Sequence, residues 1–157
     1  MRKRVITDSP QATPPASGDW LKLDEVAEVE ISSEDATHPI ESALVPGEGA
    51  GWRAAVPGKQ TIRLLFSRPQ TLRRIWLSFV ENSAQRTQEY VLRCSSDGGQ
   101  SFREIVRQQW NFSPGGANSE TEDHQVELAG VNVLELIITP DIGNGGAFAC
   151  LAQLRVA

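Results

Sequence analysis

The sequence predicts an all-β fold, a sandwich or barrel of antiparallel strands. From Trp20 onward, short apolar stretches follow one another and are separated by turn residues, and little of the chain shows helical spacing. Ser96-Asp97-Gly98-Gly99 lies between two such stretches and is a strong β-hairpin signal, because Gly tolerates the positive φ of tight turns. Both observations favour a protein built from consecutive hairpins.

We expect eight strands, taken in chain order. Val29 and Ile31 alternate with glutamates, which is typical of a half-buried strand. The run that begins at Gln60 is rich in β-branched and aromatic residues and stops at Arg68-Pro69. The other strands are bounded by polar or Gly-rich segments in the same way. The predicted strands are 26–31, 60–66, 71–80, 89–95, 101–109, 125–128, 133–139 and 148–156.

The length and composition indicate one domain with an ordinary core. The chain has 157 residues and a mass of 17.2 kDa, with 39% hydrophobic and 22% charged residues. Residues 1–19 are rich in Pro, Ser, Thr and Ala, so we expect them to form an extended lead-in to a domain that spans residues 20–157.

The charge and the cysteine content limit the partners and the compartment that we expect for the protein. The formal net charge of -5 argues against nucleic acid as the main partner. No apolar run approaches the roughly 20 residues that a membrane span needs, and the basic start of the chain lacks the apolar core of a signal peptide. Cys94 and Cys150 have no metal-site or redox spacing, so we expect two reduced, buried thiols and a cytoplasmic protein.

The sequence contains no pattern that predicts catalysis. It has two histidines, His38 and His124, and neither forms a metal-ligand spacing with other His or Cys residues. Gly143-Asn144-Gly145-Gly146 lacks the Lys-Ser/Thr of a phosphate loop and is predicted to be a turn. We therefore expect a protein that is not an enzyme and that has no cofactor or metal.

The order of several segments resembles that of discoidin (F5/8 type C) domains. The opening of those domains is similar to 27–34, 39–44 and Gly51-Trp52 here, and their next strand is similar to 57–64. The most specific match is 90–99 followed by Ser101-Phe102, a tyrosine strand that leads into the Ser-Asp-Gly hairpin. The resemblance covers about residues 24–157.

The resemblance implies a jelly-roll, galactose-binding-like β-sandwich, similar to bacterial carbohydrate-binding modules. Members of the family bind glycans, and sometimes lipid head groups or proteins, through loops at one end. Family members often carry Asp-Gly in a structural calcium loop, where this chain has Ala43-Leu44-Val45-Pro46. Val45 offers no carboxylate to a cation that prefers six to eight oxygen ligands, which puts the calcium of the family in doubt, although loop carbonyls could still hold an ion.

Three loops, 38–51, 81–88 and 110–124, lie at the end of the fold that the resemblance implicates, and they supply the predicted ligand-binding residues. Arg86 and Asn82 are the expected partners of sugar hydroxyls, and Trp110 or Phe112 the expected stacking face. Glu81, His38 and His124 complete the candidate set.

Each of these residues also has a structural alternative. Arg86 is equally consistent with a solvated turn residue or with a salt bridge to Glu89. The alternation of Trp110 and Phe112 is consistent with the end of a strand whose two rings pack in the core. His38-Pro39 is an ordinary turn opening. Trp52 and Tyr90 are expected in the core.

Two functions remain open at this stage. The first is a non-catalytic module that binds a mono- or oligosaccharide, and the second is a protein-interaction adaptor on the same fold. The oligomeric state is not predicted.

Overall fold

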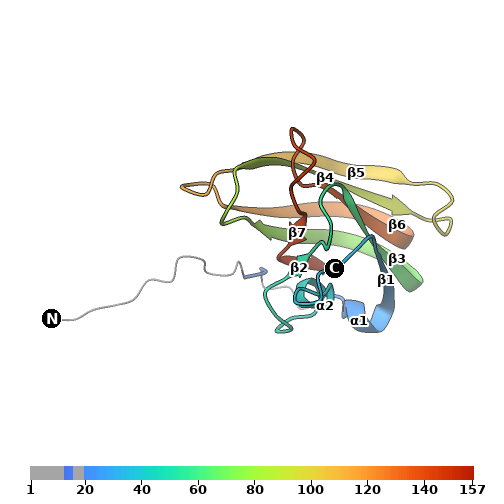
Figure 1. The fold of residues 1–157 in the computed structure, drawn as a ribbon. Helices are drawn as coiled ribbons and strands as arrows, with labels where there is room; N and C mark the ends of the chain where they lie inside the picture. The colour runs from blue at the N-terminus through green and yellow to red at the C-terminus, as the bar shows by residue number, and fades with distance from the viewer. Residues whose placement is uncertain (1–12, 16–19) are drawn as a thin grey trace.

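The protein is an antiparallel β-sandwich, as predicted, in a computed structural model that describes residues 13–15 and 20–157 (Figure 1). The expected lead-in, residues 1–19, lies largely outside the described residues. No helix in the described part of the chain is long and apolar enough to cross a membrane. The elements of that part are α1 (Leu23–Val26), β1 (Ala27–Ile31), α2 (Glu41–Leu44), β2 (Trp52–Arg53), β3 (Gln60–Val80), β4 (Arg86–Ser95), β5 (Arg103–Phe112), β6 (Ser119–Thr139), β7 (Cys150–Leu151) and β8 (Gln153–Val156).

Two of the strands are much longer than predicted. The expected strands 60–66 and 71–80 are one strand, β3, and 125–128 and 133–139 are both part of β6. The register between β3 and β6 shifts between Leu65 and Arg74, so both strands bend there. Pro69 lies within this shift and has no register partner, so its missing N–H interrupts no ladder. Proline therefore marks a bend here and not a strand end.

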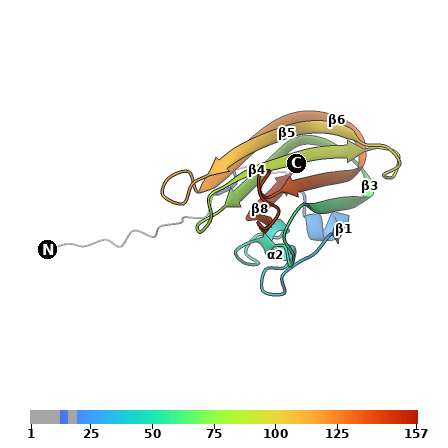
Figure 2. The same cartoon turned by 45° about the horizontal axis from the view of Figure 1, so that its top comes forward.

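The bend lets β3 and β6 take part in both layers of the sandwich. The first half of β3 and the second half of β6 belong to a layer with the order β1-β3-β6-β4-β5. The second half of β3 pairs with β8 on one side and with the first half of β6 on the other. Phe79 of β3 stacks on Tyr90 of β4 with ring centroids 5.2 Å apart, which is a contact across the two layers. Figure 2 shows β4, β5 and β6 curving over β8 and α2.

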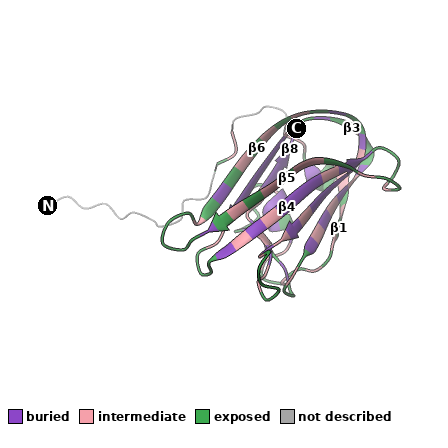
Figure 3. Ribbon diagram, turned by 90° about the horizontal axis from the view of Figure 1, so that it is seen from above, coloured by how far each residue is buried: buried purple, intermediate pink, exposed green. Residues whose placement is uncertain are grey.

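The core lies between the two layers and follows the period-two pattern of the strands. Tyr90, Leu92 and Cys94 lie at alternate positions of β4 and are 0 to 5% exposed. Figure 3 shows buried segments, in purple, along β4. Trp52 is 1% exposed and its indole N–H donates to the carbonyl of Ser33, 3.0 Å away. The predictions that Trp52 and Tyr90 are core residues are confirmed.

The predicted hairpin joins β4 to β5. Gly98 and Gly99 have φ of 78° and 93°, which only glycine adopts at no cost. The Asp97 carboxylate accepts hydrogen bonds from the Ser95 and Ser101 hydroxyls, and these bonds hold the pKa of that carboxyl well below its usual range.

The predicted final strand, 148–156, is divided between two sheets. Cys150 and Leu151 (β7) pair with β2, whereas β8 pairs with β3. The division falls at Ala152, whose N–H donates to the carbonyl of Ser78. The sequence of this run is apolar except for Gln153 and Arg155 and carries no sign of the change of partner. Both cysteines are free, as predicted; Cys94 is buried and Cys150 half-buried.

Gly51 makes this arrangement possible. Its φ is +109°, and a β-carbon placed on it would lie 2.6 Å from the Leu151 carbonyl oxygen and 2.8 Å from the Ala152 Cα. Only a residue without a side chain permits β2 to approach β7 this closely.

We expect Gly51→Ala to destabilise the protein by about 1–3 kcal/mol, because the substitution adds both backbone strain and a clash with main-chain atoms. Chemical denaturation measures the change. Gly58→Ala is the matched control, because Gly58 also has a positive φ, of +92°, but has open space around it. Equal losses in the two variants would contradict the role given to close packing.

Candidate functional site

The loops 81–85 and 113–118 meet at one end of the sandwich. The Glu81 N–H donates to the Asn118 carbonyl at 2.8 Å, and the Asn118 amide donates to the Asn82 side-chain oxygen at 3.3 Å. Asn82 is exposed. The expectation that these two loops lie together is therefore confirmed, although both are shorter than the predicted 81–88 and 110–124.

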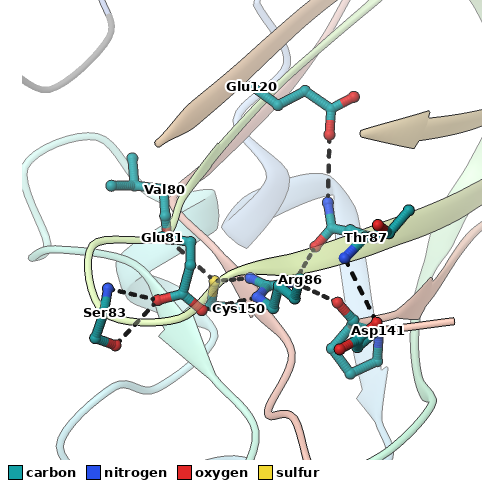
Figure 4. A network of polar contacts seen from close by, with 10 residues as sticks. Val80, Glu81, Ser83, Arg86, Thr87, Glu120, Asp141 and Cys150 are labelled. Atoms are coloured by element: carbon teal, nitrogen blue, oxygen red, sulfur yellow. Dashed lines mark hydrogen bonds and ion pairs between the residues drawn. The ribbon is translucent and has the colours of Figure 1, made fainter. Parts of the chain in front are cut away.

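Arg86 is not the exposed sugar ligand that its position suggested. It opens β4, its side chain is 1% exposed, and the guanidinium donates to the Glu81 carboxylate at 2.7 Å and to the Gln88 amide oxygen at 3.1 Å. It also donates to the Pro140 carbonyl at 2.7 Å and contacts the Cys150 sulfur at 3.4 Å. Figure 4 shows the guanidinium at the centre of these partners. Arg86 thus ties three segments of the loop end together.

The two predicted stacking residues are also built into the sandwich. Phe112 is 0% exposed, and the Arg86 guanidinium lies over its ring at 4.7 Å. Trp110 lies two residues earlier on β5, is half-buried and packs against the core. Both side chains follow the inward alternation of the strand, which is the structural alternative considered for them.

His124 is likewise a strand residue. It lies on β6 rather than in a loop, and its Nε2 is 2.8 Å from the Tyr90 hydroxyl. The Tyr90 hydroxyl therefore has a hydrogen-bond partner, and the histidine supports the core.

The exposed chemistry at this end of the fold comes from residues that the sequence analysis largely missed. The Arg53 guanidinium lies 5.2 Å from the centre of the Phe148 ring, and Arg53 is exposed whereas Phe148 is half-buried. Backbone hydrogen bonds join the same place to His38, because the Arg53 N–H donates to the His38 carbonyl and the Asp35 N–H donates to the Arg53 carbonyl. We call Asp35, His38, Arg53 and Phe148 the loop-end cluster.

The electrostatics of the loop-end cluster favour an ionised Asp35. Hydrogen bonds from the Thr37 hydroxyl and backbone to Asp35 hold the pKa of that carboxyl below its usual value, and the nearby Arg53 guanidinium lowers it further. The His38 Nδ1 lies 2.9 Å from the Thr37 hydroxyl. The cluster thus offers a carboxylate, an imidazole, a guanidinium and an aromatic ring on one surface.

The loop-end cluster could not be recognised in the sequence, because its residues are far apart in the chain. Arg53 and Phe148 are far apart in the chain and meet only because β2 pairs with β7, where Arg53 lies opposite Cys150. The strand-like run 148–156 gave no reason to expect a partly exposed aromatic ring at its start. His38 is the one predicted site residue that belongs to the cluster.

A second polar group is buried behind the loops. Glu120 is 2% exposed, one of its carboxylate oxygens has no hydrogen-bond partner, and the other accepts a long hydrogen bond from Gln88 at 3.4 Å. Burial, assisted by the neighbouring Glu122 carboxylate, raises the pKa of Glu120 to about 7. Arg86 opposes this shift only weakly because its charge is already paired with Glu81.

The residues present do not fit the calcium of the discoidin family. The segment that follows α2 closes on itself, because the Ser42 hydroxyl donates to the Glu48 carbonyl at 3.0 Å. The buried guanidinium of Arg155 donates to the Ala43 carbonyl at 2.9 Å, so a fixed positive charge already lies against this segment. Among the described residues, no group of three or more His, Cys, Asp or Glu side chains is placed to hold a metal ion.

The buried position of Arg86 makes it a structural residue. We expect Arg86→Ala to lower the free energy of unfolding by about 3–5 kcal/mol, because the Glu81 charge loses its partner and the Pro140 carbonyl loses its donor. Arg107→Ala is the control, because Arg107 forms two ion pairs but is 52% exposed, and its loss is expected to cost at most about 1 kcal/mol. Thermal and denaturant unfolding of both variants test this, and similar small losses would return Arg86 to the set of candidate ligands.

Glu120 makes stability depend on pH. Its folded-state pKa of about 7 lies above the ordinary value of 4.5, so the folded protein holds a proton that the unfolded chain has lost between these values. The free energy of unfolding therefore contains a contribution that is complete below pH 4.5 and is lost as the pH rises through 7.

Glu120→Gln removes that contribution, and the difference between the wild-type and variant curves isolates it. The difference curve is needed because burial also lowers the pKa of His124, which gives the stability a pH slope of opposite sign. Denaturant unfolding between pH 4 and 8 should show the wild type losing stability relative to the variant as the pH rises. A constant difference would contradict an elevated pKa.

Comparison with known proteins supports the fold. No family model matches the sequence, and no curated protein matches it. Among solved structures, the family 32 carbohydrate-binding module of Clostridium perfringens NanJ, in complex with galactose, has a TM-score of 0.62 at 18% identity, covering 87% of this chain and 96% of that one.

Two further solved structures are similar over most of their length. A second family 32 module from Clostridium perfringens, in complex with GalNAc-β-1,3-galactose, has a TM-score of 0.64 at 19% identity and covers 88% of this chain and 99% of that one. A pectin-binding carbohydrate-binding module has a TM-score of 0.61 at 15% identity, with coverages of 84% and 90%. The chain therefore has the same β-sandwich fold as these modules.

Proposed function

We propose that this chain is a non-catalytic carbohydrate-binding module that binds a mono- or oligosaccharide through the loop-end cluster. The observation that carries the proposal is the placement of the Arg53 guanidinium against the Phe148 ring beside His38 and Asp35. Sugars present an apolar C–H face and a set of hydroxyls, and a ring flanked by planar and charged polar groups suits both.

Each residue of the cluster has a distinct role in this proposal. Phe148 packs against the C–H face of the sugar. Arg53 donates two parallel hydrogen bonds to adjacent hydroxyls, which its planar guanidinium allows. Asp35 accepts from a hydroxyl, and His38 donates or accepts according to its tautomer.

Two features support binding without chemistry. A glycosidase needs two carboxyl groups that face each other across the sugar, whereas Asp35 is the single carboxylate of the loop-end cluster. The modules with similar structures include binding modules seen with galactose and with GalNAc-β-1,3-galactose, and those sugars are the natural first probes.

The adaptor function has less support at this end of the fold. The large apolar side chains that are exposed in the described part of the chain are Val56 and Ile142, at 51% and 52%. Two isolated side chains offer little of the contiguous apolar surface that marks a protein interface. We also propose that the protein works in a reducing compartment such as the cytoplasm, which is supported by its two free cysteines.

NMR titration with galactose and GalNAc-β-1,3-galactose tests the carbohydrate proposal. We expect shifts at the loop-end cluster with a dissociation constant in the roughly micromolar to millimolar range, since a stacking contact contributes about 1 kcal/mol. Phe148→Ala and Arg53→Ala should each weaken binding at least about tenfold.

The chain supplies a matched control. Arg93 lies over Phe102 at 4.4 Å, so it is a second arginine–phenylalanine pair, held by the β4–β5 hairpin away from the loop-end cluster. Phe102→Ala should leave sugar binding unchanged. If glycans shift no loop-end resonance at millimolar concentration, or shift only those of the 81–85 loop, the proposed site is wrong.

A further inference from the structure

A groove that the carbohydrate site does not use lies between β1 and α2. It has a volume of about 410 Å³, which is within the range of ligand-binding pockets. Its floor is apolar and its rim is acidic. The residues that line it are Asp24, Ala27, Val29, Ile31, Glu34, Ile40, Glu41, Leu44 and Val45.

The groove runs along the free edge of a sheet. β1 is the first strand in the order β1-β3-β6-β4-β5, and in the described part of the chain it pairs with β3 alone. Ala27, Val29 and Ile31 face the groove, and the intervening Glu28 and Glu30 are exposed on the opposite face. An edge strand offers unpaired backbone N–H and C=O groups to an added strand.

The charge around this edge has a single sign. Between Leu23 and Trp52 the chain carries eight carboxylates and neither lysine nor arginine. This segment therefore contributes -8 to a formal net charge of -5, so that the remainder of the chain contributes +3. Arg63 reaches Glu30 from the sheet side at 3.7 Å, but both side chains are about half exposed, so the pair is weak.

The local backbone is already fixed, so the groove does not depend on a partner to form. The Glu34 carboxylate accepts the Ile40 N–H at 2.9 Å and closes the turn between β1 and α2. The Arg155 guanidinium holds the end of α2 through the Ala43 carbonyl. A preformed groove reduces the ordering cost of binding.

We propose that this edge binds an extended peptide segment of a partner protein in which basic and apolar residues alternate. The peptide adds as a strand beside β1, which uses the free backbone groups of the edge. Its apolar side chains enter the groove beside Val29 and Leu44, and its basic side chains lie next to Glu28 and Glu30 on the other face. The period-two alternation of β1 thus selects the same alternation in its ligand.

A synthetic peptide of sequence Arg-Val-Lys-Ile-Arg-Val-Lys, added to the full chain, tests the proposal by NMR. We expect shifts at β1 and α2, with affinity that falls as salt is added because the rim charges are exposed. Glu28→Lys with Glu30→Lys should weaken binding at least about tenfold. The control, Glu104→Lys with Glu127→Lys, makes the same change in net charge at other exposed positions and should leave affinity unchanged.

A second measurement tests strand addition itself. Only every other amide of an added strand points toward β1, so N-methylation of one alternate set of peptide amides should abolish binding and methylation of the other set should not. Equal effects of both sets would overturn strand addition, as would peptide shifts on the β4–β5 face or none at all.

Two other occupants of the groove are distinguished by the same spectra. If Arg2→Glu, Lys3→Glu and Arg4→Glu, introduced together, shift the β1 resonances without any peptide, the chain itself supplies the segment and the partner proposal is wrong. If the β1 resonances shift with protein concentration alone, the edge binds a second copy of the chain, and the partner proposal is equally wrong.

Discussion

The antiparallel pairing of β3 with β6 is the interaction on which the rest of the structure depends. The ladder runs from Gln60 opposite Ile138 to Val80 opposite Ser119 and bends in the middle, so two strands serve both layers. β1 and β8 attach to β3, and β4 attaches to β6. Because the bend returns both strands to the same end of the sandwich, the start of β3 and its last residue emerge close to the loops that carry the candidate site. Loss of the bend would separate those loops.

Ion pairs and hydrogen bonds then hold that end together where apolar packing stops. Arg86 connects Glu81 in one loop with the Pro140 carbonyl in another, and covers Phe112 at the edge of the core. A buried arginine is tolerated here because each donor has an acceptor and the charge has a partner. Removing one member of a buried ion pair lowers the free energy of unfolding by far more than the pair contributes to it. Arg86 can therefore be a structural residue although it lies beside the loops at this end of the sandwich. Glu120, which keeps one oxygen without a partner, shows the opposite case, and its raised pKa is the consequence.

The sequence predicted the fold more closely than the site, and the residues show why. The strand 89–95 and the Ser96-Asp97-Gly98-Gly99 hairpin depend on neighbours in the chain, so they were visible in the sequence and are confirmed. The union of 60–66 with 71–80 was not visible, because Arg68-Pro69 looks like a strand end unless the bulge in the β3–β6 register is known. Arg53 and Phe148 meet through the pairing of two-residue strands, β2 and β7, which leave almost no pattern. Arg86, in contrast, had the right chemistry for a sugar ligand, and only the structure shows that all of it is used internally.

The groove beside β1 and the loop-end cluster share one segment of the chain. They differ in chemistry because neighbouring side chains of that segment belong to different surfaces. Glu34 turns toward the groove and bonds the Ile40 N–H, whereas its neighbour Asp35 belongs to the loop-end cluster and accepts from Thr37. Each carboxylate is committed to the backbone of the same turn, so each stabilises a geometry that both surfaces need. Acidic side chains on the groove repel one another and favour a cationic partner, while at the cluster Arg53 offsets the charge of Asp35 and leaves a surface suited to neutral hydroxyls. The segment 24–53 can therefore present a charged surface and a nearly neutral one without a change of conformation, since local hydrogen bonds, and not a moving part, separate them.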